Sequence, residues 1–379
     1  MVSSRPDDAA AHHQARASSP LSDLGIMVTY PPTPRLKGSR VNQHKATIHD
    51  VARIAGVSRA TVSRYLNGGK WVSEDAAAKI KVAIEQTHYV ANTHARALVT
   101  GRAGSVAFLL GEPQKLLFED PNFATLLRAV ADELGKRGTS FLLMTTDNKD
   151  EERRNIAYLQ AGHVDGVIQV AWHQDSSKML AALVKAGIPT VVAEQPSDET
   201  LPVGYVHVED YGSARKACEY LLSRGARRLA MIAGPEGPSG TRDRVHGFLD
   251  TLAAAGVGSS DAAPIVHGDY SSASGERAMS ELLDFHPDID AVFISSDAMA
   301  VGAMKTLRAR GIAVPDDMQI VGFDDSSAAM LADPPLTTVR QPFDQIGKHL
   351  VDQLLRIIAG EQPIGVTLPC ELVVRDTTR

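Results

Sequence analysis

The 379-residue sequence has few cysteines, few aromatic residues and no long hydrophobic run. Its two cysteines, Cys218 and Cys370, are far apart and have no neighbouring metal ligands, which excludes a disulfide framework and a zinc site of the usual spacing. No apolar run approaches the roughly 20 residues that a membrane-spanning helix needs. We therefore expect neither a metal site nor a membrane partner.

Signals for export and for catalysis are missing as well. Residues 1–43 are rich in Ala, Ser, Pro and charge where a signal peptide has an apolar segment, so the chain is expected in the cytoplasm. This stretch is expected to be a disordered tail, or to lie upstream of a true start at Met27. The glycine-rich loop at residues 234–240 lacks both the Gly-x-Gly-x-x-Gly spacing and a Lys-Ser/Thr ending. Because no set of nucleophile, base and acid stands out either, neither an enzyme nor a cofactor is expected.

Residues 47–67, by contrast, carry the pattern of two short helices joined by a turn. Thr47 can cap the first helix, with Asp50 three residues later as its hydrogen-bond partner. Gly56 allows a sharp turn, and Ser58 can cap the second helix. Apolar residues recur at helical spacing on the inner faces of both helices: Ile48, Val51, Ala52, Ala55, Val62 and Leu66. This arrangement is typical of a DNA-reading helix-turn-helix.

The outer face of the second helix carries the residue types that read DNA. Arg59 lies in its first turn, and Arg64 lies a little more than one turn further on. The planar fork of an arginine can donate two hydrogen bonds to O6 and N7 of guanine in the major groove. Residues 44–103 contain nine Lys or Arg against four Asp or Glu, whereas the whole chain has a net charge of −6. A basic head on an acidic body indicates that DNA binding is delegated to one end of the chain.

Beyond residue 104 the sequence alternates short apolar segments with helical ones, which predicts parallel sheets built from right-handed crossovers. Strands are expected at residues 105–110, 141–144, 166–170, 190–193, 205–208, 229–233, 291–294, 319–322 and 367–374. Their number suits two doubly wound lobes. In such folds ligands bind at the carboxyl ends of the strands, here in the cleft between the lobes.

Polar residues follow several of the predicted strands: Asp210, Arg242, Arg244, Tyr270, Ser296, Asp297 and Asp324. Carboxylates and arginines form bidentate hydrogen bonds with vicinal hydroxyl groups, and the ring of Tyr270 can stack on the apolar face of a sugar. The pattern therefore predicts that the cleft binds a small-molecule effector, with a sugar favoured. Asp210 and Asp297 could instead cap the helices that follow them.

Residues 46–104 resemble the DNA-binding head and hinge of the lactose-repressor/galactose-repressor (LacI/GalR) family of bacterial transcription regulators. The motifs are Thr-Ile-x-Asp-Val-Ala from residue 47, Ala-Gly-Val-Ser-x-x-Thr-Val-Ser-Arg-x-Leu-Asn at residues 55–67 and Ala-Arg-Ala-Leu at residues 95–98. The resemblance continues to the C-terminus. It implies an all-α helix-turn-helix head with a hinge helix, joined to a two-lobed α/β body of parallel sheets similar to periplasmic binding proteins.

The domain boundaries follow from this resemblance. We expect a tail at 1–43, the helix-turn-helix domain at 44–90, the hinge helix and linker at 91–103, and an effector-binding and dimerisation domain at 104–379. Lobe 1 would comprise about 104–208 and 342–366, and lobe 2 about 209–341 and 367–379. Residues 334–342 resemble the family's crossover back into the first lobe.

The resemblance also assigns residues to DNA. Arg59, Ala60 and Arg64 match base-reading positions, and Leu98 matches the hinge leucine that is inserted into the minor groove at the operator centre. The alternative for Leu98 is packing of the hinge against the body. The full set expected to contact DNA is Thr47, Ser58, Arg59, Ala60, Thr61, Ser63, Arg64, Asn67, Asn92, Arg96 and Leu98.

For the effector, Arg244, Tyr270, Ser296 and Asp324 match positions that hold the ligand in the family. Asn122 and Phe123 match positions of the first lobe that close the pocket. The expected effector set is Asn122, Phe123, Asp210, Arg242, Arg244, Tyr270, Ser296 and Asp324.

Taken with the resemblance, the sequence predicts a DNA-binding transcriptional regulator, with a repressor favoured. It would bind a near-palindromic double-stranded operator as a homodimer, with an affinity controlled by the effector. The alternative is a solute-binding protein of the periplasmic type without a transcriptional role. The DNA-binding head and the missing signal peptide disfavour that alternative.

Overall fold

The computed structural model describes residues 46–66, 71–89, 101–112, 114, 116–146, 148–171, 177–198, 200–257 and 263–379. Its internal contacts divide the chain into two compact units, with the boundary between residues 90 and 91. We refer to the first unit as the head and to the second as the body.

Three helices form the described part of the head: α1 (Ile48–Ala55), α2 (Arg59–Leu66) and α3 (Glu74–Thr87). They enclose a small core of Val51, Ala52, Ala55, Val62, Ile80 and Ala83. The backbone N–H and the hydroxyl of Thr47 donate to the carboxylate of Asp50 at 3.0 and 2.8 Å. The hydroxyl of Ser73 accepts a hydrogen bond from the amide of Ala76 and caps α3. Local capping chemistry therefore fixes where the helices of the head begin.

The first lobe of the body is built on a six-stranded parallel sheet in the order β11-β5-β4-β3-β1-β2. Its strands are β1 (Ser105–Leu110), β2 (Ser140–Thr145), β3 (Gly166–Val170), β4 (Thr190–Val192), β5 (Gly204–Val208) and β11 (Gly365–Leu368). Its helices are α5 (Leu116–Glu119), α6 (Pro121–Lys136), α7 (Lys149–Gln160), α8 (Ser177–Lys185) and α14 (Phe343–Ile358).

The second lobe has a six-stranded sheet in the order β12-β10-β9-β8-β6-β7, in which only β12 is antiparallel to its neighbour. The strands are β6 (Leu229–Ala233), β7 (Ile265–His267), β8 (Ala291–Ile294), β9 (Gln319–Asp324), β10 (Thr337–Arg340) and β12 (Glu371–Val373). The helices are α9 (Asp210–Ser223), α10 (Ser239–Ala255), α11 (Ser272–Phe285), α12 (Asp297–Ala309) and α13 (Ser327–Leu331).

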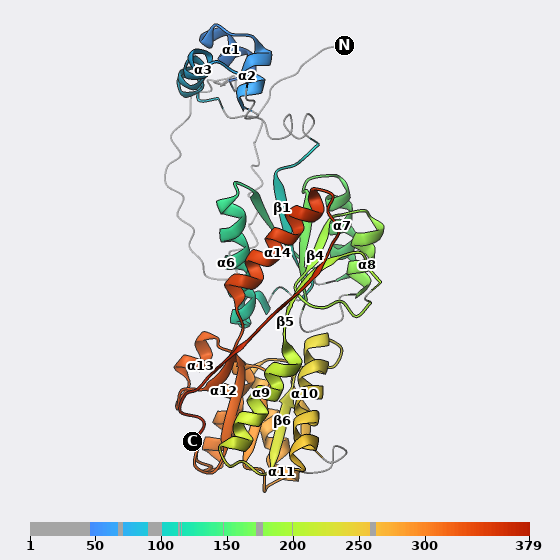
Figure 1. Cartoon of the computed structure of the whole chain (residues 1–379), viewed down its shortest axis with the longest axis vertical. Coiled ribbons are helices and arrows are strands. Elements are labelled where there is room, and N and C mark those ends of the chain that lie inside the picture. Colours follow the sequence, from blue (N-terminus) through green and yellow to red (C-terminus); the bar gives the residue numbers. More distant parts are fainter. Residues whose placement is uncertain are drawn as a thin grey trace, which may run out of the picture. The chain divides into compact units, whose positions relative to one another are not determined.

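Each lobe is a three-layered α/β/α sandwich. In the first lobe α6 and α14 cover one face of the sheet, while α7 and α8 cover the other, as Figure 1 shows. In the second lobe α9 and α10 pack together, and α11 and α12 pack closely on each other. The inner strands β3, β6 and β8 are buried on both faces, as expected for parallel sheets between layers of helices. The fold expected from the sequence is thus confirmed.

The chain passes between the two lobes three times: after β5, after β10, and between β11 and β12. The sequence predicted one strand at residues 367–374, but the structure has two short strands there. Residues 367 and 368 pair with β5 and belong to the first lobe, whereas β12 pairs with β10 in the second. The segment at 334–342, read as a crossover, also contains β10 before it crosses. The intervening Pro369, which has no N–H to donate to a ladder, separates the two strands.

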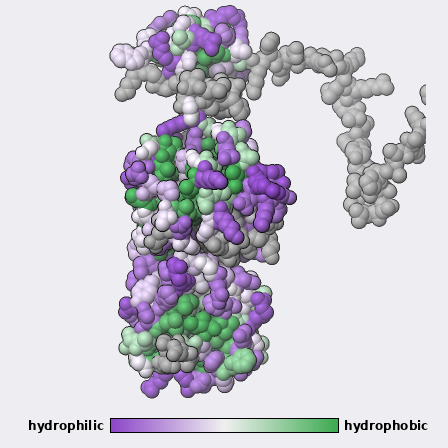
Figure 2. Space-filling model, turned by 90° about the vertical axis from the view of Figure 1, so that its right-hand side faces the viewer, coloured by the Kyte–Doolittle hydropathy of each residue, from purple (hydrophilic) through white to green (hydrophobic). Residues whose placement is uncertain are grey.

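The surface of the body includes apolar as well as polar areas. Figure 2 shows hydrophobic surface gathered on the second lobe. Among the exposed apolar side chains of this lobe are Met330 and Leu331 on α13, of which Leu331 is 84% exposed. Within the described ranges, no helix combines the length and the apolar character needed to cross a membrane.

Candidate functional site

The turn between α1 and α2 has the geometry that a helix-turn-helix needs. Gly56 ends α1 with φ = 65°, in the left-handed region that favours glycine. The Ser58 hydroxyl oxygen accepts the amide N–H of Thr61 at 3.1 Å and so caps α2. Val62 is completely buried beneath α2. These contacts fix which face of α2 remains outside.

The outer face of α2 presents the side chains that the sequence predicted for DNA. Arg59, Ala60 and Arg64 are exposed, while Thr61 and Ser63 are half-buried. Hydrogen bonds from the backbone and hydroxyl of Thr47, followed by that from Arg53, lower the pKa of Asp50 to about 2. Asp50 is therefore a charged structural partner of Thr47 at neutral pH. The remaining residues predicted to contact DNA lie outside the described part of the chain: Asn67, Asn92, Arg96 and Leu98.

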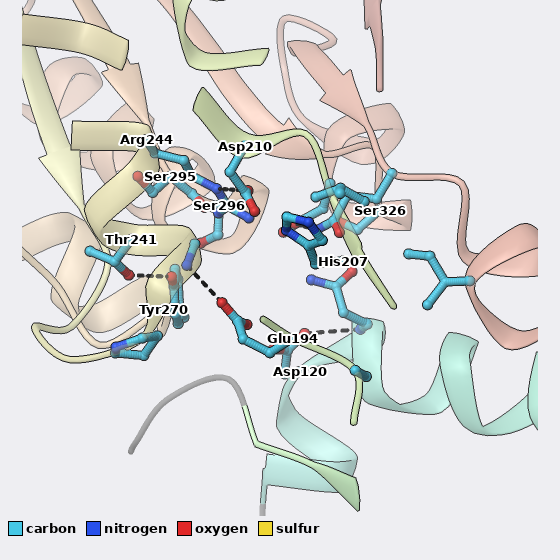
Figure 3. Close-up of a pocket in the computed structure, with 18 of the residues that line it drawn as sticks. Asp120, Glu194, His207, Asp210, Thr241, Arg244, Tyr270, Ser295, Ser296 and Ser326 are labelled. Carbon is cyan, nitrogen blue, oxygen red and sulfur yellow. Dashed lines mark hydrogen bonds and ion pairs between the residues drawn. The ribbon is translucent and has the colours of Figure 1, made fainter. Parts of the chain in front are cut away.

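A pocket lies between the two lobes of the body, at the carboxyl ends of strands from both sheets. Figure 3 shows its side chains converging from both lobes. The first lobe contributes β5, the loop after β4 and the start of α6, and the second contributes α10, the start of α9 and the residues that follow β7, β8 and β9. Its polar lining consists of Asp120, Asn122, Glu194, His207, Asp210, Thr241, Arg244, Tyr270, Ser295, Ser296, Asp324, Ser326 and Gln341.

Arg244 of α10 is held at one wall of this pocket by a buried ion pair. Its Nε donates to the Asp210 carboxylate at 2.7 Å, and its Nη1 donates to the carbonyl oxygen of Ser295 at 2.8 Å. The guanidinium also lies 3.6 Å from the centre of the Phe323 ring. Burial raises the pKa of Asp210, and Arg244 opposes that rise. The guanidinium is therefore fixed in position and orientation before a ligand arrives.

Asp324 ends β9 and points into the same pocket. Its φ of 118° is outside the usual range for a residue other than glycine, and such strain is concentrated at binding sites. Gln341, on the crossing to the first lobe, donates from Nε2 to Oδ1 of Asp324 at 2.7 Å. Burial raises the pKa of Asp324 to about 7, although Arg244 counteracts this effect. Asp324 thus offers acceptor oxygens that can be neutralised near pH 7.

Tyr270 and Ser296 complete the wall formed by the second lobe. The hydroxyls of Tyr270 and Thr241 are hydrogen-bonded at 2.9 Å, and burial raises the pKa of Tyr270 to about 12. A side chain at Gly234 would lie 2.2 Å from the Tyr270 hydroxyl, so glycine there makes room for the ring. The hydroxyl of Ser296 accepts the amide of Met299 and caps α12.

Two residues predicted for the effector lie elsewhere. Phe123 is completely buried in the core beneath α6, because it is on the helix face that packs against the sheet. Arg242 is exposed and lies 3.5 Å from Asp243, because it is on the outer face of α10, two residues from Arg244. Neither lines the pocket, whereas Asn122, Asp210, Arg244, Tyr270, Ser296 and Asp324 do.

Asp210 and Asp297, for which the alternative was capping of the helices that follow them, have different partners. Asp210 pairs with Arg244, and the side chain that caps α9 is that of Glu209. Asp297 accepts the hydroxyl of Thr338 at 2.6 Å and the amide of Ser326 at 2.7 Å. Asp297 therefore connects α12 to β10 and to the loop after β9 rather than capping its own helix.

Glu194 and His207, both from the first lobe, line the pocket but were not predicted from the sequence. Glu194 follows β4 and accepts hydrogen bonds from the Ser239 hydroxyl at 2.5 Å and the Gly240 amide at 2.7 Å, at the start of α10 in the second lobe. Burial, followed by the charge of Asp210, raises the pKa of Glu194 to about 7. His207 lies within β5, and burial lowers its pKa. The position of Glu194 just after a predicted strand was the available signal.

Comparison with known proteins gives matches over both units. Residues 47–92 match a family model described as "Bacterial regulatory proteins, lacI family", and residues 218–378 match "Periplasmic binding protein-like domain". The chain is 38% identical to the HTH-type transcriptional regulator CelR of Thermobifida fusca over 88% of this chain and 99% of that one. It is 34% identical to a ribose operon repressor of Halalkalibacterium halodurans over 88% and 97% of the two chains.

Solved structures with the same architecture include complexes. A transcriptional regulator CelR–cellobiose complex has a TM-score of 0.70 and 37% identity, covering 88% of this chain and 99% of that chain. A Lac repressor dimer bound to operator and the anti-inducer ONPF has a TM-score of 0.75 and 26% identity, covering 88% and 98%.

Proposed function

Because the chain belongs to the LacI family of bacterial regulatory proteins, we propose that it is a repressor whose operator affinity is set by a sugar bound between its lobes. Like these relatives, it is a DNA-binding regulator of transcription and not an enzyme. The proposal rests on the presence of two features in one chain: exposed arginines on α2, and a pocket between two α/β lobes at the carboxyl ends of their strands.

The head reads the operator through α2 in the major groove. Arg59, in its first turn, donates to a guanine, while Arg64 extends the contact along the same face. Asn92, Arg96 and Leu98 of the hinge add contacts at the operator centre. A homodimer presents two heads to two half-sites, which makes the operator near-palindromic. The exposed hydrophobic surface of the second lobe is of the kind that such an association covers.

The pocket is suited to a ligand with several hydroxyl groups. Arg244 and the carboxylates of Asp210 and Asp324 donate and accept hydrogen bonds in the planar, paired geometry that vicinal hydroxyls require. The Tyr270 ring lies in the wall and offers an apolar face. The relative captured with cellobiose has the same fold and 37% identity, which supports a sugar.

Ligand binding is coupled to DNA because the pocket is made by both lobes. A sugar that contacts Asp324 on one side and Asn122 on the other changes how the lobes close. Such a ligand alters operator affinity only if it binds one closure state more tightly than the other. A differential affinity of about 1–3 kcal/mol is typical of this kind of coupling.

Operator selection from a random DNA pool tests the proposal directly. The purified full chain is expected to enrich a near-palindrome, and one compound from a panel of mono- and disaccharides is expected to change that binding. Arg59→Ala should weaken the operator by about 1–3 kcal/mol and relax one base position. Equal loss on operator and scrambled DNA would make Arg59 a phosphate contact, and no enrichment under any condition would contradict the proposed function.

A further inference from the structure

The charges that line the pocket are strongly unbalanced. Among the described residues that line the pocket, four carry a carboxyl group: Asp120, Glu194, Asp210 and Asp324. One described lining residue, Arg244, carries a guanidinium, and none of them is a lysine. Arg244 is already paired with Asp210. Burial lowers the pKa of His207, so its ring is neutral at neutral pH. Burial raises the pKa values of Glu194 and Asp324 to about 7, so at pH 8 the charge that faces a ligand is negative.

A place in the pocket that is suited to an anion, the start of α10, is occupied by the protein itself. The start of α10, with its amide N–H groups and the positive end of its dipole, would attract a phosphate or carboxylate. Instead, the Glu194 carboxylate accepts both the Ser239 hydroxyl and the Gly240 amide at this point. Figure 3 shows Glu194 reaching this site from the opposite lobe.

The sequence of α10 accommodates this carboxylate. A side chain at Gly240 would place its Cβ 3.2 Å from a Glu194 oxygen and 3.2 Å from an Asp210 oxygen. These distances are shorter than ordinary van der Waals contacts, so with a side chain at this position the two acids would have to shift by a few tenths of an ångström. Glycine at this position therefore lets Glu194 lie directly against the helix start.

We propose that Glu194 determines the charge class of the effector: it excludes phosphorylated and carboxylated sugars, and the pocket selects an uncharged polyhydroxyl compound. This inference rests on the proposed function for the existence of an effector, but the exclusion itself is a property of the pocket. An anion near α10 would face the carboxylates of Glu194 and Asp210 without a free cation among the lining residues described. A neutral hydroxyl, by contrast, can donate to these same oxygens.

Inorganic phosphate tests the exclusion without knowledge of the effector. Thermal unfolding of the full chain is measured at pH 8 in 50 mM phosphate and in potassium chloride of equal ionic strength. We expect no specific stabilisation of the wild type. Glu194→Ala should gain about 2–4 °C in phosphate because the helix start becomes available to the anion. If this variant does not fold, Glu194→Ser removes the same carboxylate.

Glu281→Ala, which removes an exposed acid on α11, is the matched control for the loss of one negative charge. It should behave like the wild type. Equal stabilisation of wild type and Glu194→Ala by phosphate would show that Glu194 does not exclude anions. No stabilisation of either protein, or an equal gain in the control, would also overturn the proposal, because α10 would then not be the site that Glu194 protects.

A second arm compares matched sugars on the selected operator: glucose with glucose 6-phosphate, and cellobiose with cellobionate. No anionic member is expected to change operator binding more than its uncharged parent, and a stronger anionic effector would refute the assignment. If no compound changes operator binding, the proposed function fails on this panel. The phosphate comparison still decides whether Glu194 excludes anions, so the two failures are distinguishable.

Discussion

Replacing Arg244 by methionine is expected to destabilise the body by about 3–5 kcal/mol, the usual cost of removing one partner from a buried ion pair. Arg244 and Asp210 have side chains that are 9% and 6% exposed and are joined at 2.7 Å. Methionine is apolar and matches the aliphatic part of the arginine side chain, while it removes the guanidinium with its charge, its donors and its contact with Phe323. The Asp210 carboxylate is then left buried without its cation.

The loss should depend on pH in a defined direction. Burial already raises the pKa of Asp210, and removal of Arg244 raises that pKa further. A carboxyl whose folded pKa exceeds its unfolded value contributes stability that is present at low pH and is lost as pH rises through the folded pKa. The penalty of Arg244→Met should therefore be larger at pH 8 than at pH 5.

Urea unfolding followed by far-UV circular dichroism measures this penalty on the full chain, in the transition of the body. Arg242→Ala is the control, because its side chain is 53% exposed and its removal should cost less than about 0.5 kcal/mol. The double variant Arg244→Met with Asp210→Asn should recover part of the loss. Similar losses for the two arginines, or no recovery in the double variant, would refute the assignment of a buried pair.

Two further predictions concern packing and pH. Gly302→Ala should destabilise the second lobe by about 1–3 kcal/mol, because the new Cβ would lie 1.9 Å from the carbonyl oxygen of Ser272, where α12 meets α11. The control is Gly135→Ala on α6: its Cβ would have no atom within 4 Å, so this variant should be neutral or more stable. The stability contribution of the protonated Glu194 should be lost as pH rises through about 7. Glu194→Gln should therefore flatten the dependence of urea stability on pH between 5 and 8, and an unchanged slope would contradict the raised pKa.

The features that the sequence predicted well depend on neighbours along the chain. Thr47 and Ser58 precede the helices that they were predicted to cap, and Gly56 ends α1. Each of these positions needs only a few adjacent residues to define its geometry. Arg244 and Asp324 were also predictable, because the carboxyl ends of parallel strands meet at one edge of a sheet.

The features that were missed depend on how the two lobes meet. Glu194 and Gln341 contact residues more than 15 positions away in the sequence. Glu194 follows a predicted strand, but nothing along the chain indicates that it contacts the start of α10. Phe123 and Arg242 do not line the pocket, whereas Asn122 and Arg244 do, because positions one or two residues apart on a helix face different directions. The three- and four-residue strands β10, β11 and β12 are too short to show a periodicity.

The three crossings have a consequence for the order in which the protein can be completed during synthesis. The head consists of contiguous residues, so it can fold as soon as they leave the ribosome. Neither lobe has this freedom: the first sheet lacks β11 and the second lacks β12 until the last segment is made. Thr377, third from the C-terminus, donates to Ile320 and accepts from Thr337. A nascent chain therefore carries a finished DNA-binding unit before it carries a finished sensor.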